Sequence, residues 1–168
     1  MKPLVSIIMG STSDYAVMES AAKVLDEMAI PFEINALSAH RTPEEVEKFA
    51  KGAEQRGLKV IIAAAGMAAH LPGVIASMTN LPVIGVPIKA SLEGLDALLA
   101  IVQMPPGIPV ATVGINASQN AGILAAQMLA LCDEKVALAL KKHKTGLKKK
   151  IVQANEELSK IRFTHKVG

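Results

Sequence analysis

The feature that most constrains this chain is a regular alternation of short apolar runs with segments of helical spacing. Runs typical of strands lie at 4–9, 32–37, 60–65, 83–88 and 109–113. Between them, apolar residues at helical spacing predict helices over 17–28, 42–57, 74–78, 92–102 and 118–131. The run at 60–65 is apolar at every position, as expected of a strand covered on both faces. Strands joined by helices favour a single parallel sheet with right-handed crossovers.

This pattern predicts an α/β fold, a three-layer αβα sandwich built on a doubly wound parallel sheet. The strand order that we expect is 2-1-3-4-5, the flavodoxin-like order. The 168 residues suit a single domain, with a catalytic α/β core at 1–131. Two further helices are expected over 133–144 and 147–162, separated by Gly146. Residues 132–168 should therefore form a C-terminal helical extension.

Composition excludes several classes of protein. A hydrophobic fraction of 51% with 20% charged residues excludes a disordered chain. The longest apolar runs, 60–69 and 81–88, are shorter than the roughly 20 residues of a membrane-spanning helix. The N-terminus lacks the pattern of a signal peptide, so a cytoplasmic location is expected. The single cysteine, Cys132, cannot form an internal disulfide, and we expect a packed thiol there.

The net charge of +3 is unevenly distributed along the chain. Residues 1–131 hold 8 Lys and Arg against 11 Asp and Glu, whereas residues 132–168 hold 10 against 4. The lysines around 141–150 could bind nucleic acid or form a solvated helical face. The chain has only four Trp, Tyr or Phe residues, so stacking platforms for bases are nearly absent. We therefore expect neither a nucleic acid nor a membrane as partner.

Three loops should meet where the strand order reverses, since ligands of such sheets bind at that point. They follow the first three strands, at 10–14, 38–43 and 66–73. The first loop carries Ser11, Ser13 and Asp14 before a helix, whose free N–H groups favour an anion such as phosphate. Helix capping is the alternative role. Asp14 would repel phosphate and suits a sugar hydroxyl better.

The other two loops carry the remaining candidates. In the second, Arg41 can grip phosphate with two N–H groups, and a histidine such as His40 suits proton transfer near neutral pH. A surface His-Arg pair is the alternative, which the expected proximity to the first loop disfavours. His70, in the third loop, fits a buried structural role and a ligand contact equally well. No Walker loop, dinucleotide fingerprint, hydrolase elbow or metal motif is present.

Five motifs in these regions resemble one known family. They are Met9-Gly-Ser-Thr-Ser-Asp14, Ser38-Ala-His-Arg-Thr-Pro43, Ala68-Ala-His-Leu-Pro-Gly73, Gly85-Val-Pro87, and Gln103-Met-Pro105 with Gly107-Ile-Pro109. Together they resemble the bacterial 5-(carboxyamino)imidazole ribonucleotide mutases of purine biosynthesis. The matches run in order from Met9 to about Leu131, and the tail after Cys132 is poorly diagnostic.

The resemblance implies an isomerase that moves a carboxyl group from the exocyclic nitrogen of an aminoimidazole ribonucleotide to the adjacent ring carbon. It implies catalysis by decarboxylation and recarboxylation with trapped carbon dioxide, no cofactor or metal, and a homo-octamer with shared sites. It also implies residue roles. His40 matches the general acid/base. The expected substrate-binding residues are Ser11, Ser13, Asp14, Ser38, Arg41, Ala68, His70 and Leu71.

The sequence departs from the family pattern at a few positions. Met67 stands where family members tend to have glycine, and could narrow the pocket or point into the core. The loops at 89–91 and 114–117 are short. Three rival functions stay open: direct carboxylation of the aminoimidazole ribonucleotide by the second class of the superfamily, a non-catalytic flavin- or nucleotide-binding module, and a structural role.

Overall fold

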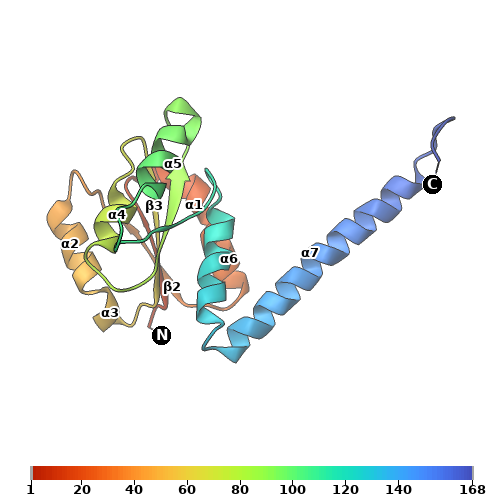
Figure 1. The fold of residues 1–168 in the computed structure, drawn as a ribbon. Coiled ribbons are helices and arrows are strands. Elements are labelled where there is room, and N and C mark those ends of the chain that lie inside the picture. Colours follow the sequence, from red (N-terminus) through yellow and green to blue (C-terminus); the bar gives the residue numbers. More distant parts are fainter. Residues whose placement is uncertain (1, 168) are drawn as a thin grey trace.

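The computed structural model describes residues 2–167 and contains a five-stranded parallel sheet of order β2-β1-β3-β4-β5. The sheet lies between two layers of helices (Figure 1). The strands are β1 (Val5–Met9), β2 (Phe32–Ala36), β3 (Val60–Gly66), β4 (Val83–Ile88) and β5 (Ala111–Thr112). In register, Val5 of β1 pairs with Phe32 of β2 on one side and Val60 of β3 on the other. The predicted strand order is confirmed.

Helices cover both faces of the sheet. The elements that connect and follow the strands are η1 (Thr12–Asp14), α1 (Tyr15–Glu27), α2 (Pro43–Lys51), α3 (Ala53–Arg56), α4 (Leu71–Ala76), η2 (Leu92–Gly94), α5 (Leu95–Val102), α6 (Ser118–Leu129) and α7 (Glu134–Lys160). Helices α1 and α6 pack on one face with the start of α7, and α2 to α5 pack on the other. The predicted αβα sandwich is thus confirmed.

Alternation along the central strand β3 builds the two halves of the core. Val60, Ile62 and Ala64 point to the layer of α1 and α6. Ile61, Ala63 and Ala65 point to the opposite layer. Because every second side chain of a strand points to the same face, an unbroken apolar run serves both layers.

Glycine at position 85 lets α5 approach β4 closely. A Cβ atom there would lie 2.3 Å from Cγ2 of Ile101 and 3.1 Å from Cγ1 of Val110. No carbon atom tolerates the shorter separation, so the sheet and α5 can pack this tightly only with glycine at this position. The adjoining Val86 is fully buried inside the subunit.

The last helix differs from the prediction. Gly146 does not separate two helices, because α7 is continuous from Glu134 to Lys160. Only Val136 and Leu140 of α7 are buried, and the remainder extends away from the sandwich (Figure 1). A glycine inside a helix costs only about 1 kcal/mol relative to alanine, which the residues around it can offset. Cys132, before α7, is exposed rather than packed.

The helix predicted over 42–57 is divided at Gly52 into α2 and α3. Thr42 precedes α2, but its side chain makes no capping hydrogen bond to that helix. Thr42 Oγ1 accepts the Ser38 N–H at 2.9 Å and donates to the Ser38 carbonyl at 3.1 Å, so it closes the preceding loop. No helix among residues 2–167 is long and apolar enough to cross a membrane.

Candidate functional site

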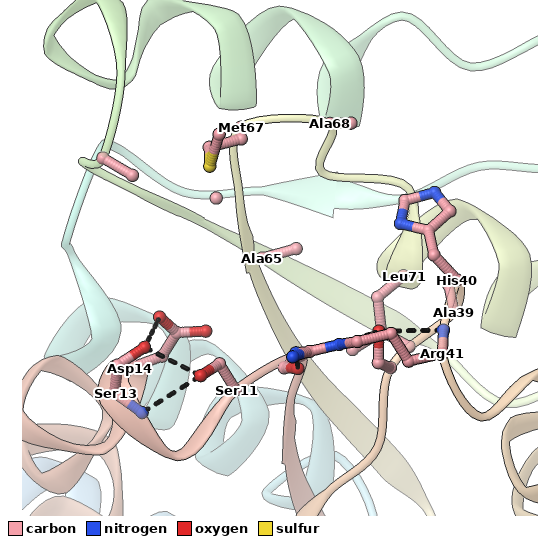
Figure 2. Close-up of a pocket in the computed structure, with 14 residues that line it drawn as sticks. Ser11, Ser13, Asp14, Ala39, His40, Arg41, Ala65, Met67, Ala68 and Leu71 are labelled. Atoms are coloured by element: carbon pink, nitrogen blue, oxygen red, sulfur yellow. Dashed lines mark hydrogen bonds between the residues drawn. The ribbon is translucent and has the colours of Figure 1, made fainter.

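A cleft of about 520 Å³ opens at the carboxyl ends of β1, β2 and β3, where the strand order reverses. All three predicted loops line it. Its walls comprise Gly10, Ser11, Ser13, Asp14, Ser38, Ala39, His40, Arg41, Ala65, Gly66, Met67, Ala68, Leu71 and Ala90. Figure 2 shows the serine-rich loop facing the His40 loop across this space. Eight of the nine predicted site residues therefore lie around one hollow.

The first loop is organised by its hydroxyl groups. Ser11 Oγ accepts the Ser13 N–H at 3.3 Å and lies 2.8 Å from Ser13 Oγ, while Ser13 Oγ lies 3.4 Å from Asp14 Oδ1 (Figure 2). Ser11 is thus the residue that caps η1, whereas Asp14 precedes α1 without a side-chain capping hydrogen bond. Capping and facing the cleft are compatible here, since the same loop does both.

Asp14 is a half-buried carboxyl group in the wall of the cleft. Burial raises the pKa of its carboxyl group above the ordinary value of 3.8. Hydrogen bonds from the Ser13 side chain and from the backbone at Ser11 oppose this rise in pKa without cancelling it. Among residues 2–167 no cationic side chain forms an ion pair with Asp14, so its partly buried carboxylate is a good acceptor for a hydroxyl group.

Arg41 connects the first loop to the second. Its Nη2 donates to the Gly10 carbonyl at 2.9 Å, and its Nε donates to Ser38 Oγ at 3.4 Å. These bonds hold the guanidinium between the two loops (Figure 2). A smaller hollow of about 340 Å³, lined partly by Ser11, Thr12 and Thr42, lies against the same residue. Arg41 therefore has N–H groups available beside hydroxyl-lined space.

His40 and His70 lie in direct contact. His40 Nε2 is 2.9 Å from His70 Nδ1, and the two rings meet edge to face with centroids 5.0 Å apart. His70 stands at the start of α4 and does not line the cleft. It is exposed, so of the two roles that its sequence left open, the buried structural one is wrong.

The third loop contains a residue in an unfavourable backbone conformation. Met67 has φ of 55°, in the left-handed region that favours glycine, and its side chain is 59% exposed. A non-glycine residue there costs about 1 kcal/mol. Met67 lines the cleft rather than the core (Figure 2). Ala68 and Leu71 lie beside it in the same wall.

Sequence reasoning missed several lining residues. These residues line the cleft mainly through small side chains or backbone, and they are Gly10, Ala39, Ala65, Gly66 and Ala90. Their position at or within a few residues of the carboxyl ends of strands was the available signal, because strand ends border the site in this type of sheet. Ala90 follows β4, a strand outside the three predicted to contribute. Among residues 2–167, no three His, Cys, Asp or Glu side chains are grouped so that they could hold a metal ion.

Comparison with known proteins gives relatives that match nearly the whole chain. An N5-carboxyaminoimidazole ribonucleotide mutase of Thermotoga maritima is 53% identical over 96% of this chain and 95% of its own length. The Bacillus subtilis protein of the same name is 50% identical over 94% of this chain and 99% of its own. A phosphoribosylaminoimidazole carboxylase of Schizosaccharomyces pombe is 52% identical, but the match covers only 29% of that longer protein.

Solved structures also match nearly the whole chain. Treponema denticola PurE superposes with a TM-score of 0.82 at 32% identity, covering 93% of this chain and 98% of that one. A PurE2 variant of the same organism has a TM-score of 0.85, covering 94% of this chain and 99% of that one. The AIR carboxylase family model matches residues 4–150, which include every strand and every residue of the cleft. The chain therefore belongs to the AIR carboxylase family.

Proposed function

We propose that this protein is an isomerase of purine biosynthesis that interconverts the carboxyamino and ring-carboxylated forms of an aminoimidazole ribonucleotide. One observation carries the proposal: a single cleft gathers His40, Arg41 and a hydroxyl-rich loop at the switch point of the sheet. The two mutase relatives described above, which match over at least 95% of their length, support it.

The roles of the cleft residues follow from their chemistry. Arg41 and Ser11 bind the ribose phosphate, because a guanidinium and hydroxyl groups donate to phosphate oxygens. Ser13 and Ser38 adjoin this position. Asp14 accepts a hydrogen bond from a ribose hydroxyl, which its partial burial and raised pKa favour.

The base-binding end is formed by the wall opposite the serine-rich loop. Ala68 and Leu71 contact the imidazole there, since small and apolar groups allow a flat ring to approach closely. His70 is near this wall through its contact with His40. Met67 lies in the same wall.

The reaction needs proton transfers and retention of carbon dioxide. Protonation of the carbamate nitrogen releases carbon dioxide and leaves an enamine-like ring carbon. That carbon attacks the released carbon dioxide, and a base removes the ring proton. His40 supplies and recovers this proton, a role worth about 10²–10⁴-fold in rate. Holding carbon dioxide beside the ring carbon adds a further gain through proximity.

The rival reaction is direct carboxylation of the aminoimidazole ribonucleotide, which the name of the Schizosaccharomyces pombe relative describes. The decisive assay supplies the purified protein with the carboxyamino ribonucleotide without ATP, and separately with the aminoimidazole ribonucleotide plus bicarbonate. We expect rapid conversion of the first substrate. Failure to consume it, with rapid use of the second, would replace the mutase with the carboxylase.

We further propose that the protein assembles as a homo-octamer with shared sites. One exposed apolar stripe runs along α7, with residues that recur at intervals of four and three: Leu147, Ile151, Ala154 and Leu158. A second exposed apolar stripe, on η2 and α5, contains Leu92, Leu95, Leu99 and Val102. Exposed apolar patches of this kind mark interfaces between subunits. Two separate patches on one subunit favour an assembly larger than a dimer.

Light scattering tests the assembly. A mass near eight times 17.6 kDa is expected for the unmodified protein. Replacement of Leu147 and Ile151 together by aspartate should reduce that mass, because charge is costly in an apolar interface. A monomeric mass at micromolar concentration would contradict the octamer.

A cytoplasmic location is part of the same proposal, and cell fractionation would test it.

A further inference from the structure

The contact between the two histidines assigns a function to one nitrogen of each ring. His40 and His70 are 30 residues apart, yet Nε2 of the first lies 2.9 Å from Nδ1 of the second. A hydrogen bond between two imidazole nitrogens requires one proton between them, donated by either ring. Nε2 of His40 is therefore occupied, which leaves Nδ1 free to face a substrate.

We propose that His70 is a positioning residue that stores the proton of His40, so that Nδ1 of His40 is the atom that exchanges protons with the substrate. The inference rests on the proposed acid/base role of His40. This role of His70 differs from closing a loop over the substrate and from contacting the substrate directly.

The proton balance of the pair is simple. In the cationic state the two rings hold three protons, on His40 Nδ1, on His70 Nε2 and between the rings. When His40 Nδ1 protonates the carbamate nitrogen, the shared proton comes to rest on His40 Nε2, and both rings are neutral. When the ring carbon later loses its proton to His40 Nδ1, the shared proton returns toward His70. The pair thus alternates between three and two protons, with no net gain over the reaction.

The surroundings leave this pair isolated from other ionisable partners. Within the cleft the other charged side chains are Arg41 and Asp14. Arg41 donates to the Gly10 carbonyl and Ser38, and Asp14 interacts with the serine-rich loop. The first turn of α2 carries Glu44 and Glu45, both exposed, and α4 contains no charged residue. Among the described residues, no carboxylate is hydrogen-bonded to His40 or His70, so each ring orients the other.

A pH dependence follows from this arrangement. At sufficiently low pH both rings are cationic, and the pair would place N–H against N–H. The hydrogen bond is then lost together with the orientation of His40. The kcat of the unmodified protein should therefore fall on the acid side as the second proton binds to the pair.

Two substitutions separate orientation from proton storage. Asparagine can place an amide near the position of Nδ1 and keep a hydrogen bond to His40, but it cannot carry the proton. Alanine removes both functions. We expect kcat to fall about 10-fold in His70→Asn and about 100-fold in His70→Ala, with KM nearly unchanged. His165→Asn, the same change in the exposed C-terminal tail, is the matched control and should leave kcat unaltered.

The experiment combines kcat and KM across pH with ¹⁵N NMR of the histidine rings. The spectra should show Nδ1 and Nε2 of His40 in distinct states in the unmodified protein, and a mixture of tautomers in His70→Ala. The acid limb of kcat should shift in both variants. A kcat of His70→Ala within about twofold of normal, or a change in KM alone, would overturn the inference. If the unmodified protein is inactive, the proposed function is wrong. The NMR spectra would still show whether His40 and His70 share a hydrogen bond.

Discussion

The α/β core and helix α7 use similar apolar residues with opposite results. In the core, Ile62 and Ile84 are fully buried between sheet and helices, whereas Ile151 on α7 is 72% exposed. The core is complete within one chain, and its strand ends form the cleft. Most of α7 gains nothing from packing within the subunit, and its exposed apolar stripe is the surface on which the proposed assembly rests.

The largest expected effect belongs to His40, at the cleft. His40→Asn should lower kcat by about 10²–10⁴-fold, because it removes the group proposed to exchange protons with the substrate. Nucleotide binding, measured by calorimetry, should persist. The corresponding change on α7, His143→Asn, should leave kcat close to normal. Retention of more than about a tenth of the normal rate in His40→Asn would exclude His40 as the acid/base.

Arg41→Ala should weaken nucleotide binding about 10–100-fold, since charge-assisted hydrogen bonds to phosphate contribute about 1.5–3 kcal/mol. Lys149→Ala, on the exposed surface of α7, is the control for loss of one positive charge. Titration calorimetry with the ribonucleotide product measures both. Equal weakening in the two variants would mean that only net charge attracts the nucleotide.

The same substitution in the two regions should have opposite signs. Gly85→Ala should lower the free energy of unfolding by about 1–3 kcal/mol, because the added methyl group collides with Ile101. Gly146→Ala should raise it by about 0.5–1 kcal/mol, since nothing lies within 4 Å of a Cβ there and alanine favours a helix. Chemical denaturation monitored by circular dichroism compares them. A change of the same sign in the free energy of unfolding of both variants would contradict the packing described for β4 or for α7.

The smallest effect is expected at Asp14. Burial raises its folded-state pKa, so the stability it contributes is present when the carboxyl is protonated and is lost as pH rises through that pKa. At neutral pH the charged group therefore costs stability, and Asp14→Asn should raise Tm slightly. Near pH 3 the difference should vanish, because the carboxyl is then largely protonated in both states. A lower Tm for the variant at pH 7 would contradict this sign.

Much of the fold and the site could be predicted from the sequence because both depend on periodicity. Alternating strands and helices fix a parallel sheet, and the sheet order then determines which loops meet. That reasoning led to Ser11, His40 and Arg41, whose convergence the cleft confirms. The roles of these residues stay predictions.

The features that could not be predicted depend on side-chain geometry or on competing small energies. The contact of His40 with His70 joins loops whose exact backbone paths no spacing reveals. Thr42 has the sequence of a helix cap, but its hydroxyl bonds Ser38 instead. Gly146 resembles a helix break, but its cost is small beside the hydrogen bonds of a continuous helix. Met67 adopts a backbone conformation that its side chain disfavours.

The most direct test of the cleft as the place where a carboxyl group moves is the fate of that carboxyl. The carboxyamino ribonucleotide is prepared with ¹³C in its carboxyl group and converted in unlabelled bicarbonate, without ATP and with a chelator present. We expect the ring-carboxylated product to retain most of the ¹³C label, at a rate that His40→Asn abolishes. Product whose carboxyl comes from the bicarbonate at the full turnover rate would contradict transfer within the cleft.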